Sequence, residues 1–260
     1  MNQPSTDSYF AEIQASAARL AEIVSTHDPD LRVPTCPDWT LRQLGTHVGR
    51  VHRWAAAIVA SRATERIPFD SVPDGKYPAA AEDRAAWLNA GADRVIAAIK
   101  AAGDQPVWAF GRLAPATFWA RRQAHETAVH RIDAELAVGQ AVVLDAGLAA
   151  DGIDEWLGML AGRGYRGADA TKALPAGARL QLRATAPGAP DADAAAEWMV
   201  GNTGAGLSLQ RGSGPADVSV SGPADRLLLA LVRRAPADDP ALAVTGAATL
   251  FSGWLAATPF

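Results

Sequence analysis

The stretch FWARRQAHETAVHRIDAEL, residues Phe118 to Leu136, decides how the chain is interpreted, because it puts carboxylate and imidazole side chains on one predicted helix. Glu126 and His130 are four residues apart, so their side chains project from one helix face and can hold a single metal ion. His125 is five residues from His130, about 140° around the helix, and cannot join that pair without distortion. The zincin motif spaces its histidines four residues apart, so HETAVH predicts a different kind of site.

The same helix admits a second interpretation, in which its charged residues form a solvated face stabilised by ion pairs between residues four apart. The residues concerned are Arg122, Glu126 and Asp133. Periodicity alone leaves the metal site and the solvated face open.

An upstream helix offers a further histidine. Thr40 and Gln43 form a capping box, which predicts a helix from Leu41 to about residue 62. Its apolar residues alternate three and four apart, as expected in a helical bundle. His47 and His52 flank that apolar stripe on opposite sides, so the pattern does not choose between them as a metal ligand.

Two kinds of segment follow one another along the chain. Helical patterns occupy about residues 7–26, 41–62, 79–102, 115–136 and 147–160, where Gly103 is expected to cap the third helix and Pro115 to open the fourth. Short alternating runs between Gly- and Pro-rich turns, typical of strands, begin near residue 174. These strands are expected at 179–185, 197–200, 207–211, 217–220 and 241–244, with helices at 224–234 and 247–257. The sequence therefore predicts an all-α helical bundle over residues 1–165 and a small α+β domain over residues 166–260.

Composition excludes several classes of function. The net charge is −4 and the Lys and Arg residues are scattered, which argues against nucleic acid as a partner. A single cysteine, Cys36, excludes an internal disulfide, and we expect it to be a packing residue without a role in chemistry. His27 is expected to cap or follow the first helix. Without a signal-peptide pattern or a long apolar run, we expect a cytoplasmic protein that does not enter a membrane.

Four segments together resemble the mycothiol-dependent maleylpyruvate isomerase family, whose N-terminal half is a DinB-like helical bundle. They are CPDWTLRQLGTHVGRVHRW, RRQAHETAVHRIDAE, AADGIDEWL and GPADVSVSGPADRLLLALVRR. The resemblance covers nearly the whole chain, and the two-domain layout of the family matches the division predicted above.

The resemblance implies a ligand set. In this family a divalent metal, usually taken to be zinc, is held by residues that match His47, Glu126 and His130. This choice leaves His52 and His125 as supporting or packing residues. Two imidazoles and one carboxylate are a common zinc ligand set, and three protein ligands leave an open position of the kind catalytic sites keep.

The resemblance also implies an activity. The family uses the open position to bind a thiol cosubstrate, mycothiol, whose thiolate adds to an unsaturated substrate. Arg234 is the best match to an arginine that stabilises carboxylate or enolate charge, and Arg233 is the next candidate. We therefore expect a metal- and thiol-dependent enzyme that isomerises a maleylpyruvate-like acid or transfers the thiol to an electrophile.

Two other classes of function remain. The protein could be a non-catalytic, metal-dependent protein that binds a small ligand or regulates a process, or the polar cluster could only stabilise a helical bundle. Thiol-dependent turnover separates the first alternative from an enzyme, and metal content tests the second.

Overall fold

The computed structural model describes residues 3–162, 174–185, 196–204 and 206–258. The chain divides into two compact units, of which the first is Ser5–Val142 and the second is Val143–Phe260 together with the residues before Ser5. The boundary expected after residue 165 lies outside the described residues. Helix α5 (Ala146–Ala161) belongs by compactness to the second unit.

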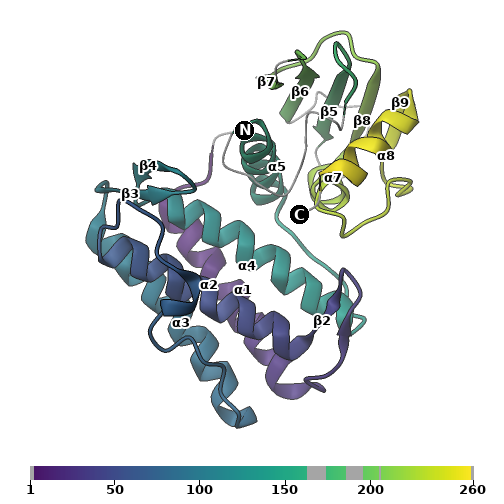
Figure 1. The fold of residues 1–260 in the computed structure, drawn as a ribbon. Coiled ribbons are helices and arrows are strands. Elements are labelled where there is room, and N and C mark those ends of the chain that lie inside the picture. The colour runs from purple at the N-terminus through teal and green to yellow at the C-terminus, as the bar shows by residue number, and fades with distance from the viewer. Residues whose placement is uncertain (1–2, 163–173, 186–195, 205, 259–260) are drawn as a thin grey trace. The chain divides into compact units, whose positions relative to one another are not determined.

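The first unit is a bundle of four helices (Figure 1), whose bounds are α1 Thr6–Thr26, α2 Leu41–Ala60, α3 Ala81–Ala102 and α4 Phe118–Ala137. The predicted capping box of α2 is confirmed, because Thr40 accepts from the Gln43 backbone and Gln43 binds the Thr40 backbone in return. Gly103, with a φ of 57°, caps the C-terminus of α3, as expected of a glycine in this position.

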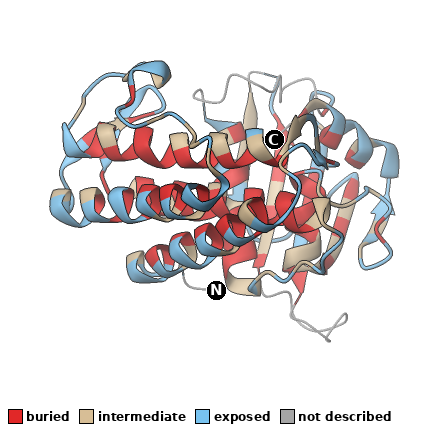
Figure 2. Cartoon of the chain, turned by 90° about the horizontal axis from the view of Figure 1, so that it is seen from below, coloured by how far each residue is buried: buried red, intermediate tan, exposed pale blue. Residues whose placement is uncertain are grey.

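The core of this unit consists of buried apolar residues from all four helices, among them Trp119 and Ile132 of α4. Figure 2 shows the buried residues of the chain in red. Helix α4 differs, because it contacts all three other helices and is buried around most of its circumference although many of its residues are polar. Its buried polar residues are Arg122, Gln123, His125, Thr127, His130, Arg131, Asp133 and Glu135. The interpretation of its charged residues as a solvated face is therefore wrong.

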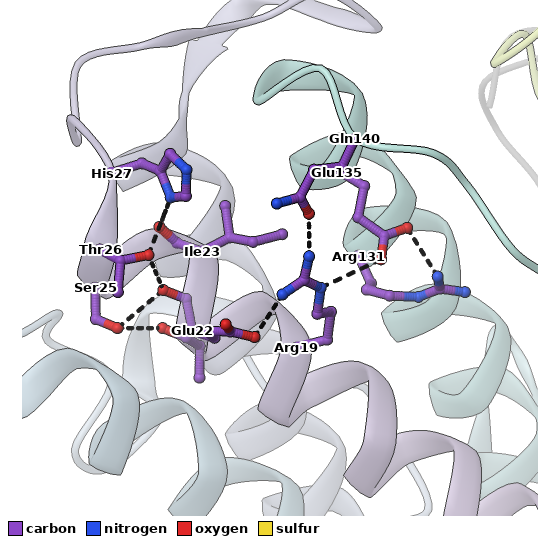
Figure 3. Close-up of polar contacts among 10 residues, drawn as sticks. Arg19, Glu22, Ile23, Ser25, Thr26, His27, Arg131, Glu135 and Gln140 are labelled. Atoms are coloured by element: carbon purple, nitrogen blue, oxygen red, sulfur yellow. Dashed lines mark hydrogen bonds and ion pairs between the residues drawn. The ribbon is translucent and has the colours of Figure 1, made fainter.

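Polar contacts join α1 to α4 near the C-terminal end of each helix (Figure 3). Nε of Arg19 lies 3.5 Å from Oε1 of Glu135, and Nη1 of Arg131 donates to Oε2 of the same carboxylate at 2.8 Å. His27 caps α1, since its backbone N–H donates to the carbonyl of Ile23 at 3.1 Å. The predicted capping role of His27 is confirmed.

Two short antiparallel hairpins accompany the bundle and were not predicted. The first pairs β1 (Arg32–Val33) with β2 (Cys36–Thr40), and the second pairs β3 (Pro106–Ala109) with β4 (Arg112–Pro115). Pro115 was expected to open the fourth helix but ends β4. The first hairpin leads directly into α2, so it fixes how that helix begins.

The connection between α2 and α3 is fastened to both helices. It contains a short 3-10 helix, η1 (Phe69–Ser71). Arg53 is almost fully buried and donates to the Asp74 carboxylate, at 3.1 Å, and to the carbonyls of Gly49 and Trp87. The guanidinium also lies 4.0 Å from the centroid of the Trp87 ring.

The second unit is a small α+β domain. Its described strands form one sheet in the order β7-β6-β5-β8-β9, in which only β5 and β8 are parallel. Helices α5, α7 and α8 contact this sheet or one another. The strands are β5 Arg179–Thr185, β6 Ala196–Asn202, β7 Leu207–Arg211, β8 Val218–Pro223 and β9 Ala243–Gly246, and the remaining helices are α7 Ala224–Leu231 and α8 Ala248–Ala257.

The predicted fold class, a helical bundle followed by an α+β domain, is confirmed. Across the described part of the chain, no helix is both long and apolar enough to cross a membrane.

Candidate metal centre

The structure brings the three predicted ligands together at one point between α2 and α4. Nε2 of His47 lies 3.0 Å from Oε1 of Glu126, and Nε2 of His130 lies 3.3 Å from the same oxygen. Glu126 and His130 face the same way because they are one helical turn apart on α4, and His47 reaches them from the second turn of α2.

The donor set and its spacing fit a zinc ion. Zinc binds imidazole nitrogen and carboxylate oxygen at about 2.0–2.1 Å, so ligand atoms at neighbouring corners of its tetrahedron stand about 3.3 Å apart. The ligand atoms of His47, Glu126 and His130 all lie within 4.8 Å of one another. Hydrogen bonds from both imidazoles to Glu126 join these atoms.

Neighbouring residues hold the carboxylate and cover the imidazoles. Nη2 of Arg122, one turn before Glu126 on α4, lies 3.2 Å from its second oxygen, Oε2. The ring of Trp39, from β2, lies 4.8 Å from the His47 ring and 5.9 Å from the His130 ring, centroid to centroid. One side of the cluster is therefore apolar, although the ligands themselves are polar.

The charges of the cluster stabilise one another. Burial alone would raise the pKa of Glu126, but hydrogen bonds from His130 and His47 and the charge of Arg122 hold this pKa well below its ordinary value. Burial would likewise lower the pKa of His130, yet hydrogen bonds to Asp133 and Glu126 raise it to about 9. These contacts favour a carboxylate at Glu126 beside an imidazolium at His130.

His52 and His125 lie outside the cluster. His52 is fully buried, and its Nε2 lies 2.8 Å from the hydroxyl of Thr127, which itself donates to the carbonyl of Gln123. The Thr127 hydroxyl therefore accepts from His52. His125 packs edge-on against Tyr9 with ring centroids 6.1 Å apart. The structure agrees with their expected supporting and packing roles.

Three residues next to His130 were not predicted as part of the site. Nδ1 of His130 lies 2.8 Å from Oδ2 of Asp133, and this carboxylate also accepts from Thr35 and Cys36. Among the residues described, Cys36, His130 and Asp133 form a second group with metal-ligand spacing, which shares its imidazole with the first. The three-residue spacing of His130 and Asp133 was visible in the sequence, whereas the approach of Thr35 and Cys36 depends on the unpredicted hairpin. Cys36 packs against the hydrophobic core, as expected of a packing residue, and its thiol also donates to Asp133.

The two candidate arginines lie in the second unit, just after α7. Arg233 donates from Nε to the carbonyl of Leu255 at 2.8 Å and from Nη2 to that of Ala256 at 3.2 Å. It thereby satisfies carbonyls at the C-terminal end of α8. Arg234 donates from Nη1 to the carbonyl of Val232 at 2.6 Å. Both guanidinium groups thus donate to backbone carbonyls of the second unit, and a role of Arg234 in catalysis stays a prediction.

Comparison with known proteins agrees with this architecture. The family described as the mycothiol maleylpyruvate isomerase N-terminal domain matches residues 10–135, and the C-terminal domain of the same proteins matches residues 147–253. Among curated proteins, no sequence matches this chain.

Two solved structures also share the fold. A crystal structure of the mycothiol-dependent maleylpyruvate isomerase superposes with a TM-score of 0.63 at 14% identity, covering 94% of this chain and 96% of that chain. The structure of a histidine-to-alanine mutant of that isomerase gives a TM-score of 0.59 with the same identity and coverage. At this identity the likeness establishes the fold.

Fold and site together define a two-domain protein whose helical bundle carries a His–Glu–His cluster between α2 and α4. The matches to both domains show that the chain belongs to the mycothiol-dependent maleylpyruvate isomerase family.

Proposed function

We propose that this protein is a metal-dependent enzyme that uses a low-molecular-weight thiol, mycothiol, as cosubstrate. The observation that carries the proposal is the convergence of His47 and His130 on one oxygen of Glu126, at 3.0 and 3.3 Å. This convergence occurs in a chain whose two domains both match a mycothiol-dependent family. The proposed substrate is a small unsaturated acid resembling maleylpyruvate.

Each residue of the centre has a proposed role. His47, Glu126 and His130 hold a divalent ion, zinc, which when bound supplies a Lewis acid that lowers the pKa of the thiol. Trp39 covers both imidazoles and keeps water from that side of the cluster. Arg234 contributes positive charge toward the carboxylate or enolate of the substrate.

The proposed isomerisation returns the thiol unchanged. The thiolate sulfur forms a bond to one carbon of the cis double bond, and the electron pair moves onto the conjugated carbonyl as an enolate. The former double bond is now single and rotates. The enolate then re-forms the double bond in the trans geometry, and the carbon–sulfur bond breaks to release thiolate.

Thiol transfer to an electrophile is the second reaction that this centre supports, because it shares the attack by thiolate with the isomerisation. The two differ in stoichiometry. An isomerase regenerates one thiol for each substrate converted, whereas a transferase consumes it. At 14% identity to the solved isomerase, the shared fold is compatible with either isomerisation or thiol transfer.

The first test is elemental analysis of the purified protein beside His47→Ala and His130→Ala, prepared in the same buffers without chelator. We expect about one zinc per chain in the wild type and loss of zinc in both variants. His27→Ala is the matched control, because this histidine caps α1 away from the cluster and should leave the zinc content unchanged. Absence of stoichiometric metal even after reconstitution would contradict the proposal.

A thiol assay then distinguishes the reactions. Unsaturated dicarboxylates and epoxides are incubated with the zinc-loaded protein and either mycothiol or glutathione, while free thiol and substrate geometry are followed together. Conversion of a cis acid at constant thiol supports the isomerase, and consumption of mycothiol supports the transferase. If neither reaction depends on the thiol, a metal-dependent binding or regulatory protein becomes the better description.

A further inference from the structure

Asp133 is a buried carboxylate with donors on both oxygens. Its side chain has no exposed surface. Nδ1 of His130 lies 2.8 Å from Oδ2, Thr35 donates to Oδ1 at 2.5 Å, and the Cys36 thiol donates to Oδ2 at 3.6 Å. A carboxylate removed from water in this way requires donors that replace its hydration, and these three contribute to that.

The donors come from two parts of the bundle. His130 precedes Asp133 by nearly one turn of α4, whereas Thr35 and Cys36 belong to the hairpin of β1 and β2 that leads into α2. The hairpin therefore fixes the carboxylate from one side, and the carboxylate fixes the imidazole on the other. His130 has no freedom to turn its ring without breaking the contact with Asp133.

A metal ion can bind the imidazole through only one nitrogen, which must be unprotonated. A hydrogen bond from the other nitrogen to a carboxylate selects the required tautomer and orients the ring. In this structure Nδ1 of His130 faces Asp133, and Nε2 faces Glu126. Because Nδ1 is hydrogen-bonded to Asp133, Nε2 faces the side of the ring on which Glu126 and His47 lie.

We propose that Asp133 is a positioning residue of the metal centre, which holds His130 as the Nδ1–H tautomer with Nε2 directed at the ion, and that Thr35 holds Asp133 in turn. This inference rests on the proposed metal site. The inference implies that the β1–β2 hairpin affects metal affinity through Thr35, although the hairpin contributes no ligand to the proposed site.

The test is metal affinity rather than turnover. Zinc is titrated into metal-free wild type, Asp133→Asn and Thr35→Val in competition with a chromophoric chelator, and the tautomers of the histidines in the zinc-loaded proteins are determined from long-range nitrogen–proton NMR correlations. Asp239→Asn is the matched control, because Asp239 is a buried aspartate in the second unit that also pairs with a cation, Arg226. Thermal unfolding of each metal-free variant reports any general loss of stability.

Asp133→Asn should bind zinc about 10- to 100-fold more weakly than wild type, which is the usual effect of losing the hydrogen-bond partner of a metal ligand. Thr35→Val should show a smaller loss in the same direction, and Asp239→Asn should keep wild-type affinity. The wild-type spectrum should show His130 protonated at Nδ1.

Wild-type affinity in Asp133→Asn, or a His130 protonated at Nε2 in the loaded wild type, would overturn the inference while leaving the metal site intact. Failure of the wild type itself to bind zinc would overturn both the inference and the proposed function. If Asp133→Asn does not fold, Thr35→Val decides, since unchanged affinity in that variant also overturns the inference.

Discussion

Nε2 of His47 lies 3.0 Å from Oε1 of Glu126, although the two residues are 79 positions apart in the chain. The contact joins α2 to α4 and makes this single oxygen the meeting point of both imidazoles. Arg122 binds the other oxygen of the same carboxylate. Glu126 is therefore the residue on which the geometry of the cluster depends.

Replacing Glu126 by Gln keeps the shape of the side chain but removes its charge. Loss of a residue that hydrogen-bonds a metal ligand typically lowers metal affinity by about 10- to 100-fold. Loss of the charge of a proposed ligand itself should lower the affinity by at least that much. Competitive zinc titration measures the effect. Glu135→Gln is the control, because Glu135 is buried and ion-paired on the same helix but lies outside the cluster. Equal zinc affinity in the two variants would contradict the ligand role.

His52 should make the stability of the bundle depend on pH. Burial lowers its pKa to about 3, with the charges of Arg53 and His47 acting in the same direction and that of Glu126 opposing them. In the unfolded chain the pKa is about 6.5, so protonation favours unfolding. The contribution of a neutral His52 is complete above about pH 6.5 and is lost as the pH falls toward 3.

We therefore expect the free energy of unfolding to fall by about 1 kcal/mol between about pH 6 and pH 5 through this residue. Denaturant titrations of wild type and His52→Gln at both pH values give the difference. The drop should be smaller in His52→Gln and unchanged in His27→Gln, whose imidazole is exposed. An identical drop in wild type and His52→Gln would show that this histidine is not buried in its neutral form.

Gly49 on α2 should not accept a side chain. A Cβ atom there would lie 1.9 Å from Cζ3 of Trp87, and the indole cannot retreat because its N–H donates to the carbonyl of Asp74. We expect Gly49→Ala to destabilise the bundle by about 1–3 kcal/mol, the usual cost of overpacking. Thermal unfolding tests this prediction.

Gly158→Ala is the informative counterpart in α5. A Cβ atom at Gly158 would meet nothing within 4 Å. Alanine favours a helix interior over glycine by about 0.5–1 kcal/mol, so this variant should be more stable than wild type. Destabilisation of equal size by both substitutions would indicate that packing against Trp87 is not the cause.

Arg233 and Arg234 should affect different properties. Arg233→Ala leaves carbonyls at the end of α8 without their donors and should cost about 1 kcal/mol of stability while activity is retained. Arg234→Ala should lower kcat by about 100-fold, as the loss of a charge-stabilising donor does. Unfolding curves and thiol-dependent turnover of both variants check the assignment. A kcat loss confined to Arg233→Ala would reverse it.

Much of the fold could be predicted because local signals were strong. The capping box of Thr40 and Gln43 gave the start of α2, and Gly103 gave the end of α3. The hairpin of β3 and β4 was missed for a physical reason. Its turn residues Phe110 and Gly111 both have positive φ, of 51° and 90°, and phenylalanine is not a residue that signals such a turn.

The candidate site was predictable only in part. The four-residue spacing of Glu126 and His130 reveals one half, since both lie on one helix face. His47 and His52 flank the apolar stripe alike, so the choice between them required the family resemblance. The structure distinguishes them, because His52 hydrogen-bonds the hydroxyl of Thr127, whereas His47 hydrogen-bonds Glu126. Burial of α4 could not be inferred, since its polar surface resembles that of a solvated helix.

The long separation of His47 from Glu126 and His130 has a consequence for the lifetime of the protein. An ion bound to all three would cross-link α2 and α4 over a loop of 79 residues. By mass action, free metal at about 100 times its dissociation constant would stabilise the folded bundle by about 2.7 kcal/mol. The supply of zinc would then set how much of the chain escapes unfolding and degradation, before any thiol or substrate is met.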